Sequence, residues 1–245
     1  MSKTKKACIA VLVLNGFVLL STAGVCATFC LPGADGAARF AAFHYYTTLS
    51  NIFAALTGIF AVAAAVRGLR GGAGTGVCPM GRAVRVLRFA GCSTVLLTMA
   101  TVFFFLAPVY HFMPSLFLGV NLFLHILNPA ASVLSFVLFE SGEEFPMSSL
   151  AAAVIPTAFY GALYFYQTLF VGPDNGGWED FYRFNMGGRW YVSAVLMLTA
   201  ALALAALLRF CAHRAAKARK RRAQSRESAP ARTTTPIRSP AVRAK

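Results

Sequence analysis

Residues 191 to 208 read YVSAVLMLTAALALAALL, and an arginine follows directly at position 209. The run contains no charged side chain. A helix of about 20 apolar residues is long enough to cross the hydrocarbon core of a bilayer. This stretch therefore predicts a membrane-spanning helix, and the arginine after it marks the side on which the helix leaves the membrane.

Five further stretches have the same character, and none has Asp, Glu, Lys or Arg in its interior. Hydrophobic residues make up 58% of the 245 residues, charged residues make up 13%, and the mean hydropathy is +0.63. Water solvates such a composition poorly, which excludes a soluble protein. We predict an all-α membrane protein, a bundle of six transmembrane helices. The predicted spans are 8–27, 43–66, 89–108, 116–139, 147–171 and 191–208.

The first span follows three lysines, so a cleaved signal peptide is the competing interpretation, with Val25-Cys26-Ala27 as a weak cleavage site. We favour a retained helix because the apolar run is longer than the hydrophobic region of a usual signal peptide, which has about 7–15 residues.

Positive charges predict the orientation, because cytoplasmic loops are enriched in Lys and Arg. With six crossings, all the strongly basic segments fall on one side, so we expect both termini in the cytoplasm and a location in a bacterial-type cell membrane. The exception is segment 140–146, which has three glutamates and no positive charge. The loop between the second and third spans carries Arg67, Arg70, Arg82 and Arg85, with Arg88 at its edge.

The carboxyl-terminal segment carries much of the net charge of +15, with 12 of the 23 Lys and Arg residues between positions 209 and 245. We divide the chain into a transmembrane domain, 1–210, and a basic cytoplasmic tail, 211–245. The tail lacks the apolar content to fold alone, so we expect it to be disordered. Its position after a span favours anionic lipid headgroups as partners over a specific nucleic acid.

The cysteines show no metal-ligand spacing, and we expect neither a metal nor a cofactor. Cys26 and Cys30 lie one helical turn apart, where a disulfide is conceivable, but buried thiols are the simpler interpretation.

Polar residues inside the spans are the main functional clue, because they are costly in lipid. Thr47, Ser50 and Asn51 share one face of the second span. Two further polar residues of the fifth span, Tyr164 and Gln167, are expected to line the same intramembrane space.

Asn121, His125 and Asn128 share one face of the fourth span. Pro129 has no N–H to bond the carbonyl of His125, so we expect a kink there. Such a stripe must face other helices or a wet cavity.

The two stripes contain the parts of a catalytic dyad. His125 can act as a base near neutral pH, and Thr47 can act as a nucleophile once a base takes its proton. Asn51, Asn121 or Asn128 can donate hydrogen bonds to an oxyanion. Taken alone, however, Thr47 is more simply a residue that bonds a neighbouring helix, a contact that contributes about 0.6 kcal/mol.

The segments YYTTLSN (45–51) and NLFLHILNP (121–129) resemble bacterial relatives of the androgen-induced membrane hydrolases. That family also includes the androgen-dependent regulator of tissue factor pathway inhibitor. Its characterised animal enzymes are multi-pass membrane proteins that use a threonine and a histidine to hydrolyse fatty-acid esters of hydroxy fatty acids. The resemblance places the threonine at Thr47 and the histidine at His125, and it implies a lipid-like ester as substrate.

The resemblance has one clear departure. The animal enzymes carry a Trp-x-Tyr-Pro-Phe-Leu segment after the fifth span, whereas residues 178–185 read WEDFYRFN, with no proline. This loop either covers the polar residues as a lid or forms an aromatic belt at the membrane interface.

Two other functions remain open. A transporter or ligand-binding membrane protein would use the same polar cavity, although the spans lack the acidic and basic residues common in transporters. A structural partner would have its polar stripes closed against each other, with no cavity between them.

Overall fold

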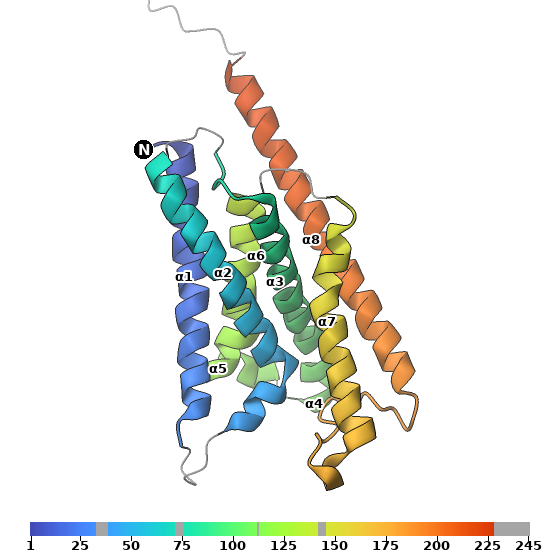
Figure 1. The fold of residues 1–245 in the computed structure, drawn as a ribbon. Helices are drawn as coiled ribbons and strands as arrows, with labels where there is room; N and C mark the ends of the chain where they lie inside the picture. Colours follow the sequence, from blue (N-terminus) through green and yellow to red (C-terminus); the bar gives the residue numbers. More distant parts are fainter. Residues whose placement is uncertain (33–38, 72–75, 112, 142–145, 228–245) are drawn as a thin grey trace, which may run out of the picture.

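The computed structural model describes residues 1–32, 39–71, 76–111, 113–141 and 146–227. Six helices in this part of the chain are long and apolar enough to cross a membrane, as predicted, and they pack into one bundle (Figure 1). The first, second and sixth spans are continuous helices: α1 (Lys3–Cys30), α2 (Tyr46–Gly71) and α8 (Trp190–Glu227).

The other three spans contain π-helical turns. The third span consists of α3 (Arg82–Thr101), η2 (Val102–Leu106) and α4 (Ala107–Tyr110). The fourth consists of α5 (Gly119–Leu122), η4 (Phe123–Leu127), α6 (Asn128–Ser135) and η5 (Phe136–Glu140). The fifth consists of α7 (Ser149–Phe165) and η6 (Tyr166–Val171).

The start of α1 and the last turns of α8 lie at the same end of the bundle (Figure 1). We call this the terminus end and the opposite one the distal end. Short 3₁₀ turns connect the spans at the distal end: η1 (Phe40–His44), η3 (Met113–Phe117) and η7 (Pro173–Asn175).

Helix α3 lies at the centre of the bundle, where it contacts α2, α6, α7 and α8. A Cβ atom at Gly91 would lie 3.3 Å from the Ala54 Cα of α2 and closer still to the Thr57 hydroxyl. Membrane helices pack through such small residues because lipid supplies no hydrophobic force between them. Gly91 therefore allows the close approach of α2 and α3.

The fourth span departs from a regular helix at His125, as Pro129 led us to expect. The π-helical turn η4 contains His125 and ends immediately before Asn128. Asn51 of α2 donates a hydrogen bond to the Leu124 carbonyl of this turn, with an N–O distance of 3.0 Å. A partner from a neighbouring helix thus satisfies a backbone acceptor of the irregular turn.

The sixth helix is longer than predicted. Helix α8 continues to Glu227, so the domain boundary that we placed after residue 210 lies inside a helix. Residues 211–227 are rich in Ala, Arg and Lys, which are strong helix formers. Arg219 also holds this part of α8 to the bundle through hydrogen bonds to the carbonyls of Val137, Leu138 and Ser141. The rest of the predicted tail, 228–245, lies outside the described residues.

Candidate functional site

Thr47 and His125 line one cavity at the distal end of the bundle, the distal cavity, with a volume of about 520 Å³. Thr47 is the second residue of α2, and His125 lies in the middle of η4. Asn121 of α5 lines the same cavity. Thr47 of the first stripe thus shares a space with Asn121 and His125 of the second. Asn51 and Asn128 do not line this cavity.

The Thr47 hydroxyl makes no hydrogen bond with any part of the chain that the structure describes. The start of α2 is held instead through its backbone. The Tyr182 hydroxyl accepts a hydrogen bond from the Tyr46 amide at 2.9 Å. Tyr182 also lines the distal cavity. Thr47 is therefore placed precisely by its helix while its own hydroxyl stays available.

His125 is 9% exposed, and its Nδ1 atom is buried without a partner. Within the described residues no carboxylate orients the ring, and no hydrogen bond joins His125 to Thr47.

Asn51 is fully buried, and its Nδ2 atom donates to two backbone carbonyls, those of Thr47 at 2.8 Å and Leu124 at 3.0 Å. Both amide protons are therefore used, so Asn51 does not serve as the oxyanion donor that we considered. It instead joins the backbone of Thr47 to the residue before His125. Asn51 fixes the spacing of the two candidate catalytic residues.

The two other asparagines differ from each other. Asn121 lines the distal cavity and makes one long hydrogen bond, 3.4 Å, to the Ser115 carbonyl. Asn128 does not line this cavity, because it faces α1. There it donates to the Thr22 hydroxyl at 3.2 Å and accepts from the Ser21 hydroxyl at 2.6 Å. Asn128 thus bonds neighbouring helices.

The two candidates of the fifth span also have different surroundings. Tyr164 is 1% exposed, and its hydroxyl donates to Asp180 at 2.5 Å and accepts from the Tyr182 amide at 3.1 Å. Gln167 does not line the distal cavity. Its main-chain carbonyl accepts hydrogen bonds from the amides of Gly172 and Trp178. Both residues therefore hold the loop that follows the fifth span. Tyr164 also lines a second cavity, described below, whereas Gln167 does not.

That loop, residues 172–189, packs over the distal end of the bundle. The Asp180 carboxylate accepts from the amides of Phe184 and Asn185, which closes the loop on itself. Trp178 stacks on His44, with ring centroids 4.6 Å apart. Burial raises the pKa of Tyr182 to about 12, so its hydroxyl is neutral at physiological pH. Phe181 and Tyr182 of the loop line the distal cavity, whereas Trp190 and Tyr191, at its end, are exposed as interface residues usually are.

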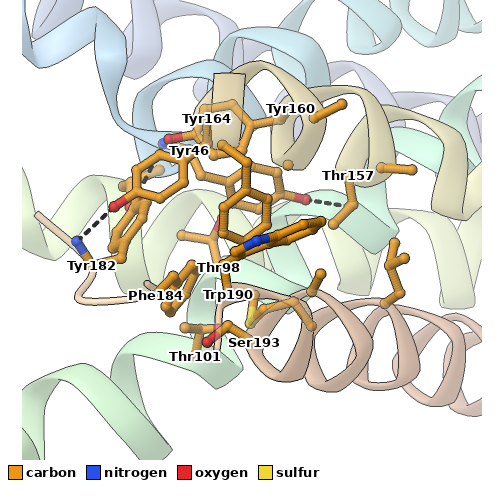
Figure 2. Close-up of a pocket in the computed structure, with 18 of the residues that line it drawn as sticks. Tyr46, Thr98, Thr101, Thr157, Tyr160, Tyr164, Tyr182, Phe184, Trp190 and Ser193 are labelled. Carbon is orange, nitrogen blue, oxygen red and sulfur yellow. Dashed lines mark hydrogen bonds between the residues drawn. The ribbon is translucent and has the colours of Figure 1, made fainter. Parts of the chain in front are cut away.

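A second cavity, the lateral cavity, lies beside the first and has a volume of about 270 Å³ (Figure 2). Its walls come from α2, the third span, α7, the loop and α8. Thr47 lines this cavity as well, and so do three other residues of the distal cavity: Val102, Leu106 and Tyr182. Thr47 therefore stands between the two cavities.

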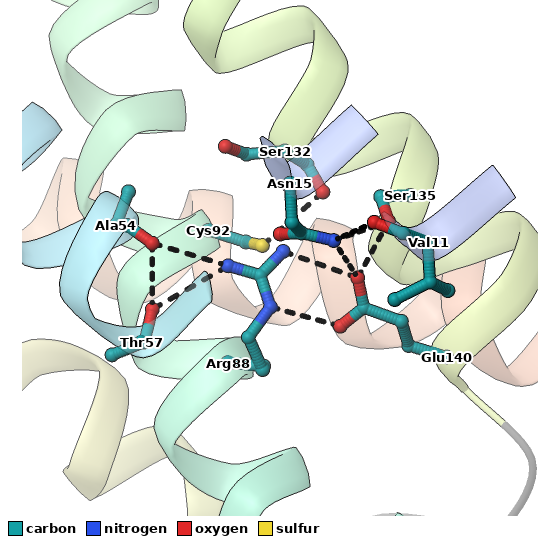
Figure 3. Close-up of polar contacts among 9 residues, drawn as sticks. All are labelled: Val11, Asn15, Ala54, Thr57, Arg88, Cys92, Ser132, Ser135 and Glu140. Carbon is teal, nitrogen blue, oxygen red and sulfur yellow. Dashed lines mark hydrogen bonds and ion pairs between the residues drawn. The ribbon is translucent and has the colours of Figure 1, made fainter. Parts of the chain in front are cut away.

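A buried ion pair near the terminus end is the main feature that the sequence analysis missed (Figure 3). The Arg88 guanidinium meets the Glu140 carboxylate in two hydrogen bonds, Nε to Oε2 at 2.9 Å and Nη2 to Oε1 at 3.2 Å. Both side chains are 0% exposed. We had assigned Arg88 to the edge of a basic loop and Glu140 to an acidic one, and the structure corrects both assignments. Residues 142–145 of that acidic segment lie outside the described residues.

Neighbouring helices complete the pair. Asn15 of α1 donates to the Glu140 carboxylate at 3.1 Å, and Ser135 of α6 donates to it at 2.6 Å. Arg88 also donates to the Thr57 hydroxyl of α2 at 3.4 Å. We call these five residues the buried ion cluster. The polar Asn15 in the middle of the first apolar run was the sequence signal that could have indicated it.

The six cysteines carry free thiols, including Cys26 and Cys30. The sulfur atoms of Cys8 and Cys78 lie 3.3 Å apart, and burial raises the pKa of the Cys78 thiol. No group of three or more His, Cys, Asp or Glu side chains among the described residues could hold a metal ion.

Comparisons with protein families, with curated proteins and with solved structures found no match to this chain. The geometry of the cavities is therefore the basis for any functional conclusion.

Proposed function

We propose that this protein hydrolyses lipid esters within the membrane, with Thr47 as the nucleophile and His125 as its general base. One observation carries the proposal. In a bundle of apolar helices, an unbonded threonine hydroxyl and an imidazole with an unbonded nitrogen line the same cavity. Unpaired polar groups are costly in a membrane, and they are typical of functional sites there.

The reaction follows from these groups. His125 takes the proton of the Thr47 hydroxyl as Thr47 Oγ1 forms a bond to the acyl carbon of the ester. The bond from that carbon to the alcohol oxygen then breaks, and the alcohol leaves with the proton from His125. Water, deprotonated by His125, then attacks the acyl carbon of the acyl-threonine. The bond from that carbon to Thr47 Oγ1 breaks, Oγ1 takes the proton back from His125, and the fatty acid leaves. Asn121, which lines the cavity, donates to the oxyanion.

The charges at the two ends of the bundle support an orientation. The basic residues that flank the spans at the terminus end, such as Lys5, Arg70 and Arg82, favour a cytoplasmic location for that end. The two cavities then lie in the outer half of a cell membrane. Exposed cations of α8, such as Arg214 and Lys217, would bind anionic headgroups.

The experiment measures hydrolysis of 4-nitrophenyl fatty-acid esters by the full chain in lipid nanodiscs. Thr47→Val keeps the shape and removes the hydroxyl, and it should abolish turnover. His125→Ala should lower turnover by about 10²–10⁴-fold, the usual contribution of a general base. Thr47→Ser should keep part of the activity.

A matched control is Thr28→Val. The Thr28 hydroxyl bonds the Val25 carbonyl of its own helix and lines neither cavity. This variant should hydrolyse the esters normally. Full turnover by both Thr47→Val and His125→Ala would refute the proposal.

A second candidate function is transport of a small molecule through the distal cavity. The observation in its favour is that the cavities lie at one end while the buried ion cluster closes the other. A transporter that opens to one side of the membrane at a time is expected to have such an arrangement in one of its states. Uptake into proteoliposomes that survives Thr47→Val would favour it over hydrolysis.

A further inference from the structure

The lateral cavity reaches the surface of the bundle between two neighbouring helices. Ala158 and Ala162 of α7 line it, as do Trp190 and Leu198 of α8, and all four residues are exposed. Trp190 is 40% exposed and Leu198 is 39% exposed. Helices α7 and α8 belong to the two least buried spans, so their outer faces meet lipid. The cavity is therefore accessible from the side, at the level of the acyl chains.

The interior of the lateral cavity suits hydrocarbon. No charged side chain is among the residues that line it. Two of its hydroxyls are already paired. That of Thr98 bonds the Ser50 hydroxyl at 2.7 Å. That of Thr157 bonds the Tyr46 hydroxyl at 2.7 Å, as Figure 2 shows. A hydroxyl with a partner presents mainly its carbon atoms to the cavity. An ionic headgroup would find no counter-charge here, whereas an alkyl chain would need none.

Thr47 differs from the other hydroxyl-bearing threonine and serine residues of the lateral cavity, such as Thr101 and Ser193, because it also lines the distal cavity. On the other side of Thr47 is the distal cavity, which contains His125 and Asn121. An ester placed at Thr47 would thus have an apolar space on one side and a polar one on the other.

We propose that the lateral cavity binds the fatty acyl chain of the ester, which enters sideways from the bilayer between α7 and α8, while the alcohol part occupies the distal cavity. This inference rests on the proposed hydrolase function. It adds an entry route and assigns each half of the substrate to a cavity.

Gly161 of α7 provides a variant that fills the cavity without a clash. It lines the lateral cavity, and a Cβ atom built on it meets no atom within 4 Å. Gly161→Leu should lower the turnover of long-chain esters by about tenfold or more and leave acetate esters unaffected, because a pocket that loses several methylene positions discriminates strongly by chain length. Gly24→Leu is the control: Gly24 is also helical with nothing within 4 Å, and it lines neither cavity.

A binding measurement separates this inference from the proposed function. A fatty acid with a terminal diazirine is photolysed with the Thr47→Val protein in nanodiscs, and the modified residues are mapped. We expect labelling of α7 and α8 at the lateral cavity that excess unlabelled fatty acid competes away and that Gly161→Leu reduces by about tenfold or more. Labelling that does not saturate, or that Gly161→Leu leaves unchanged, would overturn the entry route even if turnover proves the hydrolase. Saturable labelling without any turnover would support the cavity and reject the hydrolase.

Discussion

At the terminus end, the charges of Arg88 and Glu140 are fully buried and meet each other in two hydrogen bonds. At the distal end, the Thr47 hydroxyl and the Nδ1 atom of His125 have no partner in the described chain, and both residues line a cavity. The first arrangement uses two charged groups to join helices, whereas the second places a threonine and a histidine, without a bond between them, beside a cavity. On the proposed function, this difference separates polar residues that hold the helices together from polar residues that act on a substrate.

The buried ion cluster also shows how neighbouring helices stabilise two charges inside the bundle. Burying two charges is unfavourable, and their attraction offsets this only when further hydrogen bonds satisfy both groups. Asn15, Thr57 and Ser135 provide those bonds from three other elements. The cluster therefore joins the first four spans near the terminus end. The two cavities lie toward the opposite, distal end.

The largest effect is expected at the ion pair. Arg88→Met leaves the Glu140 carboxylate buried and unpaired, which should reduce the free energy of unfolding by about 3–5 kcal/mol. The double variant Arg88→Met with Glu140→Met removes both charges and should recover much of this loss. Unfolding of the detergent-solubilised chain, followed by circular dichroism, measures both effects.

The control for this prediction is Arg82→Met, which removes an exposed charge from the same helix. It should change stability little. If Arg88→Met is as stable as Arg82→Met, the pair contributes nothing and the contrast between the two ends fails.

A smaller effect is expected at Asn51, which connects the second and fourth spans near the cavities. Asn51→Leu leaves the Leu124 carbonyl buried without its donor and should cost about 1–3 kcal/mol of stability. It should also lower ester turnover, because the spacing of Thr47 and His125 is no longer fixed. Unfolding and turnover are measured on the same preparation.

Asn175→Leu is the matched control, because Asn175 bonds the Val171 carbonyl in an exposed position. Its loss should have little effect on either measurement. Normal turnover in Asn51→Leu would show that the distal end does not need this connection.

The smallest effect is expected at Tyr182. Tyr182→Phe keeps the ring and removes the acceptor of the Tyr46 amide, a loss of about 0.5–1.5 kcal/mol. The effect should be local, seen as faster hydrogen exchange in the peptide that contains the start of α2. Tyr191→Phe, at an exposed position, should leave that exchange unchanged. Equal exchange in the two variants would show that the loop does not hold α2.

The six spans could be predicted from the sequence because hydropathy summed over about 20 residues does not depend on which helices are neighbours. The irregular turn at His125 was predictable for a similar reason, since Pro129 removes a local hydrogen bond. Both features depend on residues that are close together in the sequence and not on which helices are neighbours.

The contacts between spans could not be predicted in the same way. Arg88 and Glu140 each stand at the end of an apolar run, where a charged residue normally reaches water, and only packing reveals that they meet. Asn121, His125 and Asn128 were predicted to share one face of the fourth span, and this prediction was wrong for Asn128. The π-helical turn η4 lies between Asn121 and Asn128 and shifts the register of the helix. Asn128 consequently bonds α1, whereas Asn121 lines the distal cavity.

The length of α8 has a consequence for how the carboxyl-terminal charges work. With 38 residues at 1.5 Å each, the helix is about 57 Å long, whereas the hydrocarbon core is about 30 Å thick. Arg222 lies about 20 Å further along the axis than Arg209. Attraction to headgroups is screened within about 8 Å at physiological ionic strength. Arg219, however, bonds the last carbonyls of the fourth span, so α8 still runs beside the bundle at that level. Arg222 lies only about 5 Å beyond Arg219 along the axis, a distance at which headgroups around this end of the bundle still attract it.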